Sequence, residues 1–363
     1  MGTETRIRRL LGMRARRGRL VVGAHKTLWQ YPANTGHGRV WSSILGHLRD
    51  LVRFEVLEAT ASQPIHAPPD VWLFDGHAGD PKVGGPAVAF VHEVGWGTPE
   101  LDEHHAPGFA ERMDRDTRDA VRCATRIITA SSSAKHEILN AYGIAAEHVH
   151  VVPHGVDRSI FHPTPATPGS LVDRLRAAET PYVLFVASLH PRKNLAAVRS
   201  AVSAIAALGL PHILVIAASP SPDRADSSAL ERSAFSELPG APGRLIRVVE
   251  PSDHELAQLM SGAAVMSQPS LAEGFGLTVL EAMACGAPLV VSNRGSLPEV
   301  VGNAAIVVEP TPDAVRDAIV RVVQQPELAA RVRSDGLERA KHFSWQRAAE
   351  GWQHVLQLAA ANS

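Results

Sequence analysis

The sequence has little cysteine, few aromatic residues, no excess of charge of either sign and no long hydrophobic run. Its only cysteines are Cys123 and Cys285, too far apart in the chain for a disulfide framework or a paired-cysteine zinc site. Lysine and arginine total 36 against 37 acidic residues, so the net charge of −1 gives no global electrostatic case for nucleic-acid binding. The longest apolar runs, such as 213–218, are well short of the roughly 18–20 residues that span a bilayer.

The remaining composition is that of an ordinary soluble globular protein, with 45% hydrophobic and 20% charged residues. A length of 363 residues favours two domains, at a prior of about 150 residues per domain. The low cysteine content is typical of a reducing compartment, and no apolar signal segment follows the start. We therefore expect a cytoplasmic protein.

The first 19 residues are rich in arginine and contain a single acidic residue, Glu4. We interpret residues 1–19 as a solvated, poorly ordered basic tail. The alternative is a peripheral contact with anionic lipid headgroups at the inner face of the membrane, with Leu10, Leu11 and Met13 as weak anchors.

From residue 20 onward, short β-rich apolar runs alternate with helical stretches, which predicts an α/β fold with parallel sheets flanked by helices. Prolines and a glycine cluster between 163 and 169, a composition typical of a linker. Two α/β halves joined by one linker predict a ligand-binding cleft between them. The expected parts are an N-terminal domain (20–165), a linker (166–178), a C-terminal domain (179–343) and a terminal helix (344–363).

The alternation places a strand at each of twelve apolar runs and marks several helices between them. A capping-box spelling at 252–255 predicts a helix start there. The predicted strands are 20–24, 54–58, 71–74, 87–91, 126–129 and 148–152 in the first half, and 182–187, 212–217, 245–249, 264–267, 288–292 and 305–308 in the second. The predicted helices include 38–51, 108–123, 133–142 and 345–360.

The most informative segment is 270–288, S-L-A-E-G-F-G-L-T-V-L-E-A-M-A-C-G-A-P, where a loop leads from a strand into a helix that opens near Gly276. Gly274 and Gly276 allow the backbone to approach a ligand, and a helix N-terminus favours phosphate. Glu273 in the loop and Glu281 in the helix can clamp hydroxyls at two ends of an elongated ligand. The alternative is that Glu281 is a solvated helix residue and that the glycines only turn the chain.

A second group of candidate residues follows the predicted strand 182–187 in the sequence V-A-S-L-H-P-R-K-N. A strand end followed by two cations and a helix start is suited to a diphosphate. Arg192 can bind phosphate oxygens bidentately, and Lys193 supplies a point charge. The alternative is a basic helix start at the surface.

Two features of the first half of the chain also directly follow predicted strands or open helices, as the motifs of the second half do. N-T-G-H-G-R at 34–39 opens a helix after the first strand, with Gly36 and Gly38 in the turn. His92 closes the predicted strand 87–91, at the edge of a parallel sheet where ligands bind. The alternative for His92 is a strand-end histidine that caps backbone groups.

The order E-G-F-G-L-T-V-L-E-A-M-A-C-G-A-P resembles the E-x7-E motif of the retaining family 4 glycosyltransferases. These enzymes have the GT-B fold, two Rossmann-like domains facing across a cleft, with a terminal helix that crosses back to the first domain. P-R-K-N-L is similar to a variant of the family's phosphate motif. The chain departs from the family pattern at Ser188, where an arginine is usual, and at Glu93, which follows His92 in place of aspartate.

This resemblance implies a metal-independent hexosyltransferase that uses a nucleotide-diphosphate sugar and needs no other cofactor. It implies that Glu273 and His92 bind the transferred sugar, and that Arg192 and Lys193 stabilise the leaving diphosphate. It also implies backbone and ribose contacts to the donor from Gly36, Gly38, Gly274, Phe275, Gly276, Leu277, Thr278 and Glu281.

The resemblance favours mannose as the sugar and does not separate GDP from UDP, dTDP or ADP. The acceptor is a glycan, a glycolipid or a small molecule, with polysaccharide or glycolipid synthesis as the expected context. Competing interpretations on the same fold are a sugar-phosphate synthase and a sugar-nucleotide epimerase. An inactive nucleotide-sugar-binding protein is a further alternative, disfavoured by intact Glu273, Glu281, Arg192 and Lys193.

Overall fold

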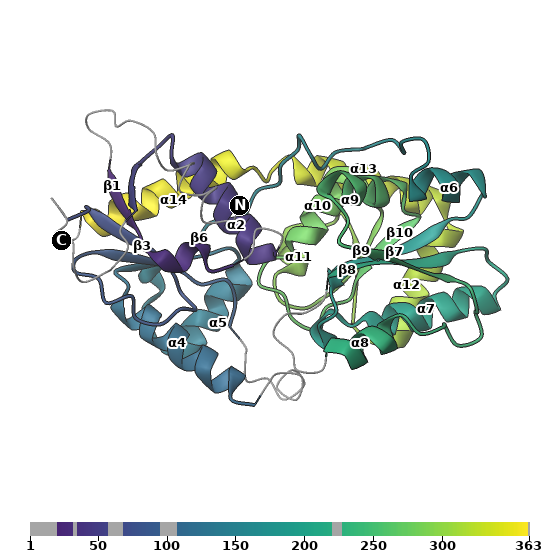
Figure 1. Ribbon diagram of the computed structural model, residues 1–363, viewed down its shortest axis with the longest axis horizontal. Coiled ribbons are helices and arrows are strands. Elements are labelled where there is room, and N and C mark those ends of the chain that lie inside the picture. The colour runs from purple at the N-terminus through teal and green to yellow at the C-terminus, as the bar shows by residue number, and fades with distance from the viewer. Residues whose placement is uncertain (1–19, 32–34, 57–67, 95–106, 220–226, 362–363) are drawn as a thin grey trace. The chain divides into compact units, whose positions relative to one another are not determined.

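The computed structural model describes residues 20–31, 35–56, 68–94, 107–219 and 227–361. The described chain forms two compact units (Figure 1). The first contains the described residues up to 155 together with 343–361, and the second contains the described residues of 156–342. Each unit is a parallel β-sheet covered by helices on both faces, as the alternating sequence pattern predicts.

The described residues of the first unit form a sheet in the order β2-β1-β3-β4-β5-β6, and every strand pair in it is parallel. β3 and β4 are buried along their whole length, because helices cover both faces of the sheet. The strands are β1 (Val21–Ala24), β2 (Arg53–Val56), β3 (Val71–Asp75), β4 (Ala87–Phe90), β5 (Arg126–Thr129) and β6 (Val149–Val151). The helices are η1 (Lys26–Trp29), α2 (Gly36–Leu48), α4 (Phe109–Cys123), α5 (Ser132–Tyr142), η2 (Ala146–His148) and α14 (Trp345–Ala360).

The described residues of the second unit form another parallel sheet, in the order β12-β11-β10-β7-β8-β9. α7 and α12 pack together against one face, and α10 packs with α9 and α13. The strands are β7 (Tyr182–Ser188), β8 (Ile213–Ser219), β9 (Leu245–Val249), β10 (Val265–Gln268), β11 (Leu289–Ser292) and β12 (Ile306–Val308). The helices are α6 (Leu171–Ala177), η3 (Pro191–Lys193), α7 (Leu195–Ala207), α8 (Ser227–Ala234), α9 (Asp253–Gly262), α10 (Leu277–Cys285), α11 (Leu297–Val301), α12 (Pro312–Gln324) and α13 (Pro326–Ala340).

The strand order places a topological switch point in each sheet. In the second unit the chain runs from β7 outward through β8 and β9, and then returns to add β10 on the other side of β7. In the first unit β2 and β3 flank β1 in the same manner. Loops leaving two such strands diverge at the carboxyl edge of the sheet, which is where open α/β sheets bind ligands.

The predicted secondary structure is largely confirmed. All twelve predicted strands are present, and the ends that fall within the described residues differ from the predicted ones by at most two residues. Residues 57 and 58 of the predicted strand 54–58 lie outside the described residues. α10 begins after Gly276 and ends at Gly286, both of which have positive φ angles, of 88° and 75°. The capping box of Ser252 and Glu255 starts α9 as its sequence predicts.

The predicted linker at 166–178 is wrong over most of its length, because α6 occupies 171–177 and lies in the second unit. The Ser170 side chain accepts a hydrogen bond from the backbone N–H of Asp173 and so caps the helix. Val172 and Leu175 are buried, and α6 packs on α9. The proline cluster precedes this helix and does not extend through it.

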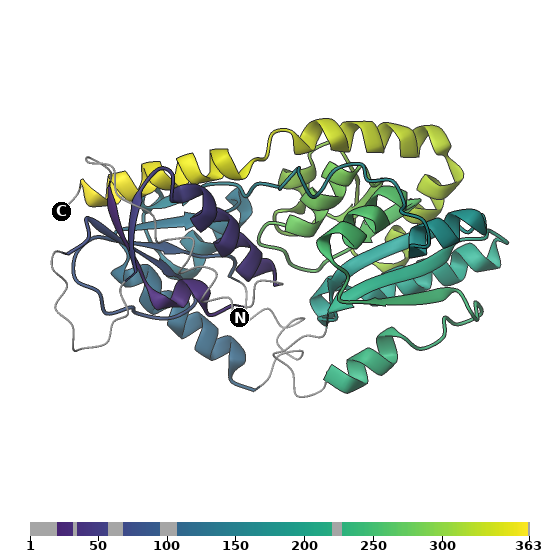
Figure 2. The same cartoon turned by 45° about the horizontal axis from the view of Figure 1, so that its top comes forward.

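The last helix belongs to the first unit. α14 packs on α2, β3, β4 and β5, and Figure 2 shows it running beside α2. Trp352 is completely buried, with its ring centroid 5.5 Å from that of Trp41 and 4.9 Å from that of Phe90. Trp352, more than 300 residues after Trp41 in the sequence, therefore completes the core of the first unit.

Candidate functional site

Two loops that leave neighbouring strands of the second sheet, 189–194 after β7 and 269–276 after β10, are hydrogen-bonded to each other. The backbone N–H of Leu271 donates to the carbonyl of Arg192 at 2.7 Å. Asn194 has a φ of 57°, and its side-chain amide donates to the carbonyl of Pro269 at 3.1 Å. His190 accepts a hydrogen bond from the backbone N–H of Arg192 through Nδ1, at 3.1 Å, and caps η3. These hydrogen bonds fix the positions of the two loops relative to each other.

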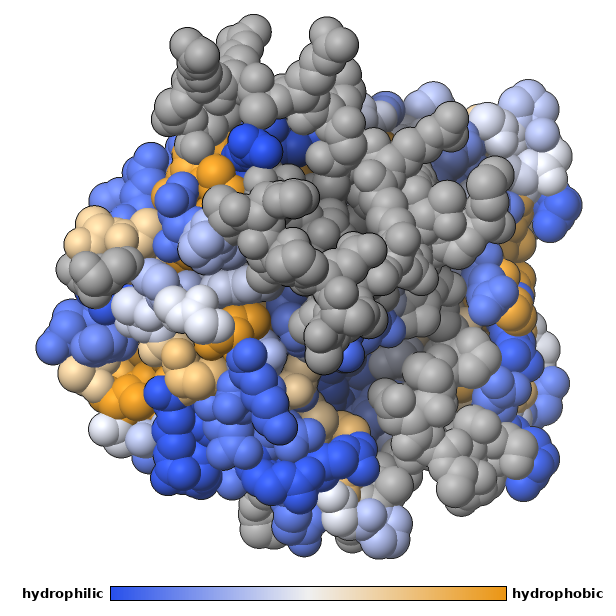
Figure 3. Space-filling view, turned by 60° about the vertical axis from the view of Figure 1, so that its left-hand side comes forward, coloured by the Kyte–Doolittle hydropathy of each residue, from blue (hydrophilic) through white to orange (hydrophobic). Residues whose placement is uncertain are grey.

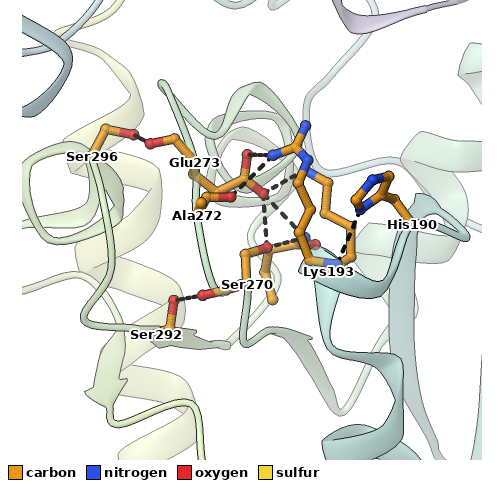
Figure 4. Close-up of polar contacts among 9 residues, drawn as sticks. His190, Lys193, Ser270, Ala272, Glu273, Ser292 and Ser296 are labelled. Atoms are coloured by element: carbon orange, nitrogen blue, oxygen red, sulfur yellow. Dashed lines mark hydrogen bonds and ion pairs between the residues drawn. The ribbon is translucent and has the colours of Figure 1, made fainter. Parts of the chain in front are cut away.

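These loops bring together Arg192, Lys193 and Glu273, although Glu273 lies 80 residues after Lys193 in the sequence (Figure 4). Lys193 Nζ lies 2.6 Å from Glu273 Oε1, and an Arg192 guanidinium nitrogen lies 3.5 Å from Glu273 Oε2. The same Arg192 nitrogen donates to the carbonyl of Ala272 at 3.0 Å. Only 8% of the Glu273 side chain is exposed, against 14% for Lys193 and 23% for Arg192.

Arg192, Lys193 and Glu273 form an ion cluster in which a guanidinium and an ammonium group lie next to one carboxylate. Both cations bind phosphate oxygens well, Arg192 through its planar fork of donors and Lys193 as a point charge. The cluster therefore places two phosphate-binding side chains at the carboxyl edge of the sheet.

Buried polar side chains fix the position of the Glu273 carboxylate through hydrogen bonds. Ser270 Oγ donates to Glu273 Oε1 at 2.8 Å, and the amide of Gln268 donates to Ser270 Oγ at 2.9 Å. The carbonyl of Glu273 accepts hydrogen bonds from both the backbone N–H and the hydroxyl of Ser296, each at 3.1 Å. Gly295 lies directly against the Glu273 backbone, where a side chain has no room. The carboxylate is thus positioned before any ligand arrives.

The N-terminus of α10 directly follows Glu273. Gly276 is its N-cap residue and makes no side-chain capping hydrogen bond, so Leu277 and Thr278 offer the first backbone N–H groups of the helix. These groups and the helix dipole favour an anion. Glu281 lies one turn further on and is only 4% exposed, so its interpretation as a solvated helix residue is wrong.

In the first unit, the glycine turn opens α2 as predicted. Thr35 Oγ1 accepts a hydrogen bond from the backbone N–H of Gly38 at 3.1 Å and caps the helix. A Cβ atom added to Gly36 meets nothing within 4 Å, so packing does not require glycine there. Asn34, at the start of the motif, lies outside the described residues.

His92 lies in a group of buried polar side chains at the ends of β3 and β4. Its backbone N–H donates to His77 Nε2 at 3.1 Å, so His77, and not His92, is the histidine that caps a backbone group. His77 Nδ1 lies 3.0 Å from Thr117 Oγ1, and the His77 backbone N–H donates to Asp75 at 2.8 Å. The His37 ring lies 3.9 Å from the His92 ring.

Several residues that support the predicted site were not expected from the sequence. Asp75 and His77 had a detectable signal, since F-D-G-H directly follows an apolar strand. Ser270 opens the recognised segment 270–288, but its hydrogen bond to Glu273 was not predicted, and Gln268 lies two residues before that segment. No sequence signal marks Gly295 and Ser296, because they contact Glu273 only once the chain has folded.

Burial keeps His77, His92 and His154 of the first unit neutral near pH 7. It lowers the pKa of His77 to about 4 and that of His154 to about 3, and it holds the pKa of His92 well below its usual value. In each case the main cause is the loss of water around the imidazole, and the neighbouring His37 lowers the pKa further. At neutral pH these side chains act as hydrogen-bonding groups without charge.

Acidification from pH 6.5 to about 4 is expected to destabilise the first unit. In this range the unfolded histidines bind protons and the folded ones do not, so the free energy of unfolding falls with pH by about 1.4 kcal/mol per pH unit for each buried histidine. Trp29, Trp41, Trp72, Trp345 and Trp352 belong to the first unit, and the described residues of the second contain no tryptophan. Urea unfolding followed by tryptophan fluorescence therefore reports this unit. A stability that stays constant from pH 7 to pH 4.5 would contradict the expectation.

No helix within the described ranges is long and apolar enough to cross a bilayer. On the face shown in Figure 3, hydrophobic residues among those coloured form small separate areas between hydrophilic ones. The arginine-rich tail at 1–19 lies outside the described residues, so its two interpretations stay open.

Comparison with known proteins gives family matches over both units. The model described as Glycosyltransferase Family 4 matches residues 15–160, and the model described as Glycosyl transferases group 1 matches residues 172–339. The MMP alpha-(1->4)-mannosyltransferase of Mycolicibacterium hassiacum is 30% identical over 298 residues, which cover 77% of this chain and 67% of that protein. The O-antigen chain mannosyltransferase B of Escherichia coli is 28% identical over 267 residues, covering 72% of this chain and 67% of that protein.

Solved structures with the same fold match almost the whole chain. Sucrose-phosphate synthase from Thermosynechococcus elongatus has a TM-score of 0.69 at 20% identity, and the match covers 100% of this chain and 94% of that one. HepE of Anabaena, in complex with UDP and glucose, has a TM-score of 0.71 at 15% identity, with 94% and 100% covered. At these identities the two matches bear on the fold.

Proposed function

This chain belongs to the glycosyltransferases of group 1 and family 4 and has their GT-B fold, and from this premise we propose that it is a retaining, metal-independent hexosyltransferase. Its donor is a nucleoside-diphosphate sugar, and its acceptor is a hydroxyl group of a glycan, a glycolipid or a small molecule. The observation that carries the proposal is that Arg192 and Lys193 lie against Glu273, in the loop that leads directly to the N-terminus of α10.

A nucleoside diphosphate leaves with growing negative charge as the glycosidic bond breaks. Fixed positive groups lower the barrier when they are already in place where that charge develops. Arg192 and Lys193 supply two full charges, and the first N–H groups of α10, at Leu277 and Thr278, supply the partial charge of a helix N-terminus. We assign these groups to the diphosphate. They serve the role that a divalent cation has in other transferases, so transfer is proposed to need no metal.

The carboxylates and the backbone N–H groups of the loop are assigned to hydroxyls of the donor. Glu273, held by Ser270, accepts hydrogen bonds from the transferred sugar. Glu281, at the end of the first turn of α10, is assigned to the hydroxyls of the ribose. The residues proposed to contribute backbone N–H groups or close backbone approach are Gly274, Phe275 and Gly276 in the second unit and Gly36 and Gly38 in the first.

Retention of the anomeric configuration is proposed to follow from attack on the same side as the departing diphosphate. The leaving phosphate oxygen accepts the proton of the acceptor hydroxyl, so the step needs no separate protein base. His92 binds a hydroxyl of the transferred sugar near the reacting carbon. The names of the two mannosyltransferases among the relatives support mannose as the sugar, with GDP or UDP as the nucleotide.

The proposal is tested by calorimetric unfolding with GDP, UDP, dTDP and ADP and their hexose conjugates, each with and without a chelator. One nucleotide class is expected to raise the melting temperature equally well with chelator present, because ligand at 100 times its Kd stabilises by about 2.7 kcal/mol. Binding that needs added metal ions, or no binding by any of them, would contradict it.

Turnover separates the remaining alternatives. Release of the nucleoside diphosphate in the presence of a sugar acceptor is expected for a transferase, whereas an inactive binding protein binds the donor and releases nothing. A sugar-phosphate synthase is distinguished by turnover only with phosphorylated sugar acceptors.

A further inference from the structure

Asp75, the last residue of β3, is a completely buried carboxylate that the proposed function does not use. One oxygen accepts a hydrogen bond from the backbone N–H of His77 at 2.8 Å. The other accepts one from the indole N–H of Trp41 at 2.9 Å and lies 3.5 Å from His92 Nε2. A buried carboxylate is costly, so one placed against a proposed sugar-binding histidine calls for an explanation.

His92 Nε2 is buried and makes no hydrogen bond, and a carboxylate oxygen of Asp75 lies 3.5 Å from it. A neutral imidazole has a proton on one nitrogen and a lone pair on the other. A lone pair on Nε2 would be repelled by the carboxylate oxygen, whereas an N–H there is attracted to it. The proton therefore belongs on Nε2, and the lone pair belongs on Nδ1.

His77 has the opposite arrangement. Its Nε2 accepts the backbone N–H of His92, so Nε2 holds the lone pair and the proton lies on Nδ1, where it is donated to Thr117 Oγ1. His77 thus fixes the backbone of His92, and Asp75 fixes its ring. Carboxylate–histidine pairs set the tautomer in this way in many sites.

We propose that Asp75 is a positioning residue that keeps His92 in its Nε2–H tautomer, so that His92 offers only a hydrogen-bond acceptor, Nδ1, to a ligand. Because Nε2 is inaccessible, a ligand group that meets His92 must donate a hydrogen bond. The arrangement selects a hydroxyl group and rejects a phosphate oxygen. That this hydroxyl belongs to the transferred sugar rests on the proposed function.

The tautomer is tested directly in the wild-type protein, with no ligand or activity required. Long-range ¹H–¹⁵N correlation spectra of protein labelled at histidine nitrogen distinguish the two neutral tautomers, and the spectrum of His92→Gln identifies the His92 signals. At pH 7.5 His92 is expected as Nε2–H and His77 as Nδ1–H. A His92 that is protonated on Nδ1, or on both nitrogens, would overturn the proposal.

The consequence for binding is tested with Asp75→Asn, which keeps the shape of the side chain and removes its charge. The affinity for the nucleotide sugar is expected to fall about tenfold, the effect of one lost neutral hydrogen bond, while the affinity for the bare nucleoside diphosphate stays as in the wild type. Trp41→Phe is the matched control, because it removes the other partner of the same carboxylate oxygen and leaves the carboxylate facing His92.

The possible outcomes distinguish a failure of the role proposed for Asp75 from a failure of the proposed function. Equal losses for the sugar conjugate and the bare diphosphate, or the same loss in Trp41→Phe, would reduce Asp75 to a structural role and overturn the proposal. If Asp75→Asn does not fold, the wild-type tautomer decides. A wild-type protein that binds no nucleotide sugar refutes the proposed function and leaves the tautomer result standing.

Discussion

Replacing Glu273 with glutamine is expected to lower kcat/KM for sugar transfer by about 10²–10³-fold, the range seen when one preorganised polar contact to a transition state is removed. The substitution removes the charge and keeps the length of the side chain. Ser270 can still donate to the remaining oxygen, so the loop is expected to keep its conformation. The measurement is steady-state release of nucleoside diphosphate together with the melting temperature of the variant.

Lys193→Ala is expected to cause a loss of similar size, mainly in kcat, because the lysine acts on the leaving group as its charge grows. Glu309→Gln is the matched control. Glu309 lies in the same unit, forms an ion pair with Arg294 and is 54% exposed, so its loss should leave transfer unchanged. Full activity in either Glu273→Gln or Lys193→Ala would refute the site assignment.

Adding a methyl group at Gly295, in the loop after β11, is expected to disrupt the site by displacing the loop that contains Glu273. Gly295 has a φ of 55°, and a Cβ atom there would lie 2.3 Å from the carbonyl oxygen and 3.0 Å from the backbone nitrogen of Glu273. Since both contacts are to backbone, the Glu273 loop must move. Gly295→Ala is expected to destabilise the second unit by about 2–4 kcal/mol, a fall of about 5–10 °C in melting temperature, and to abolish transfer.

Gly240→Ala is the matched control, because it distinguishes the effect of backbone strain from the effect of a steric clash. Gly240 has a φ of 69°, and a Cβ atom added to it meets nothing within 4 Å. This variant should lose only about 1 kcal/mol, from the positive φ angle alone, and stay fully active. Equal effects of the two substitutions in calorimetry, with transfer retained in both, would show that the contact between Gly295 and Glu273 has no functional weight.

Local sequence patterns were sufficient for most of the fold. The runs 71–74 and 182–187 are continuously apolar because both faces of a parallel sheet are covered, and this pattern is visible without a structure. α6 was missed because prolines directly before it suggested a linker, while its capping serine and two buried aliphatic residues are a weak signal over seven residues. Short helices depend on packing that the local sequence does not display.

The sequence identified the motifs of the candidate site one by one, but it did not predict that they contact one another. Arg192, Lys193 and Glu273 were each recognised from their own neighbours in the sequence. That the two loops form one cluster follows from β10 pairing with β7 across the switch point, a long-range event that local spacing cannot reveal. The same limit explains why Gly295 was missed and why His92 was singled out without the carboxylate that faces it.

The position of α14 has a consequence for the order in which the protein folds. During synthesis, residues 156–342 leave the ribosome before α14 does, so the second unit can fold while the first still lacks its last helix. Until residues 343–361 arrive, the faces of Trp41 and Phe90 that Trp352 covers stay open to water. The nascent chain thus exposes part of an apolar core for the time needed to make almost 200 residues, which makes the unfinished first unit a natural client for chaperones.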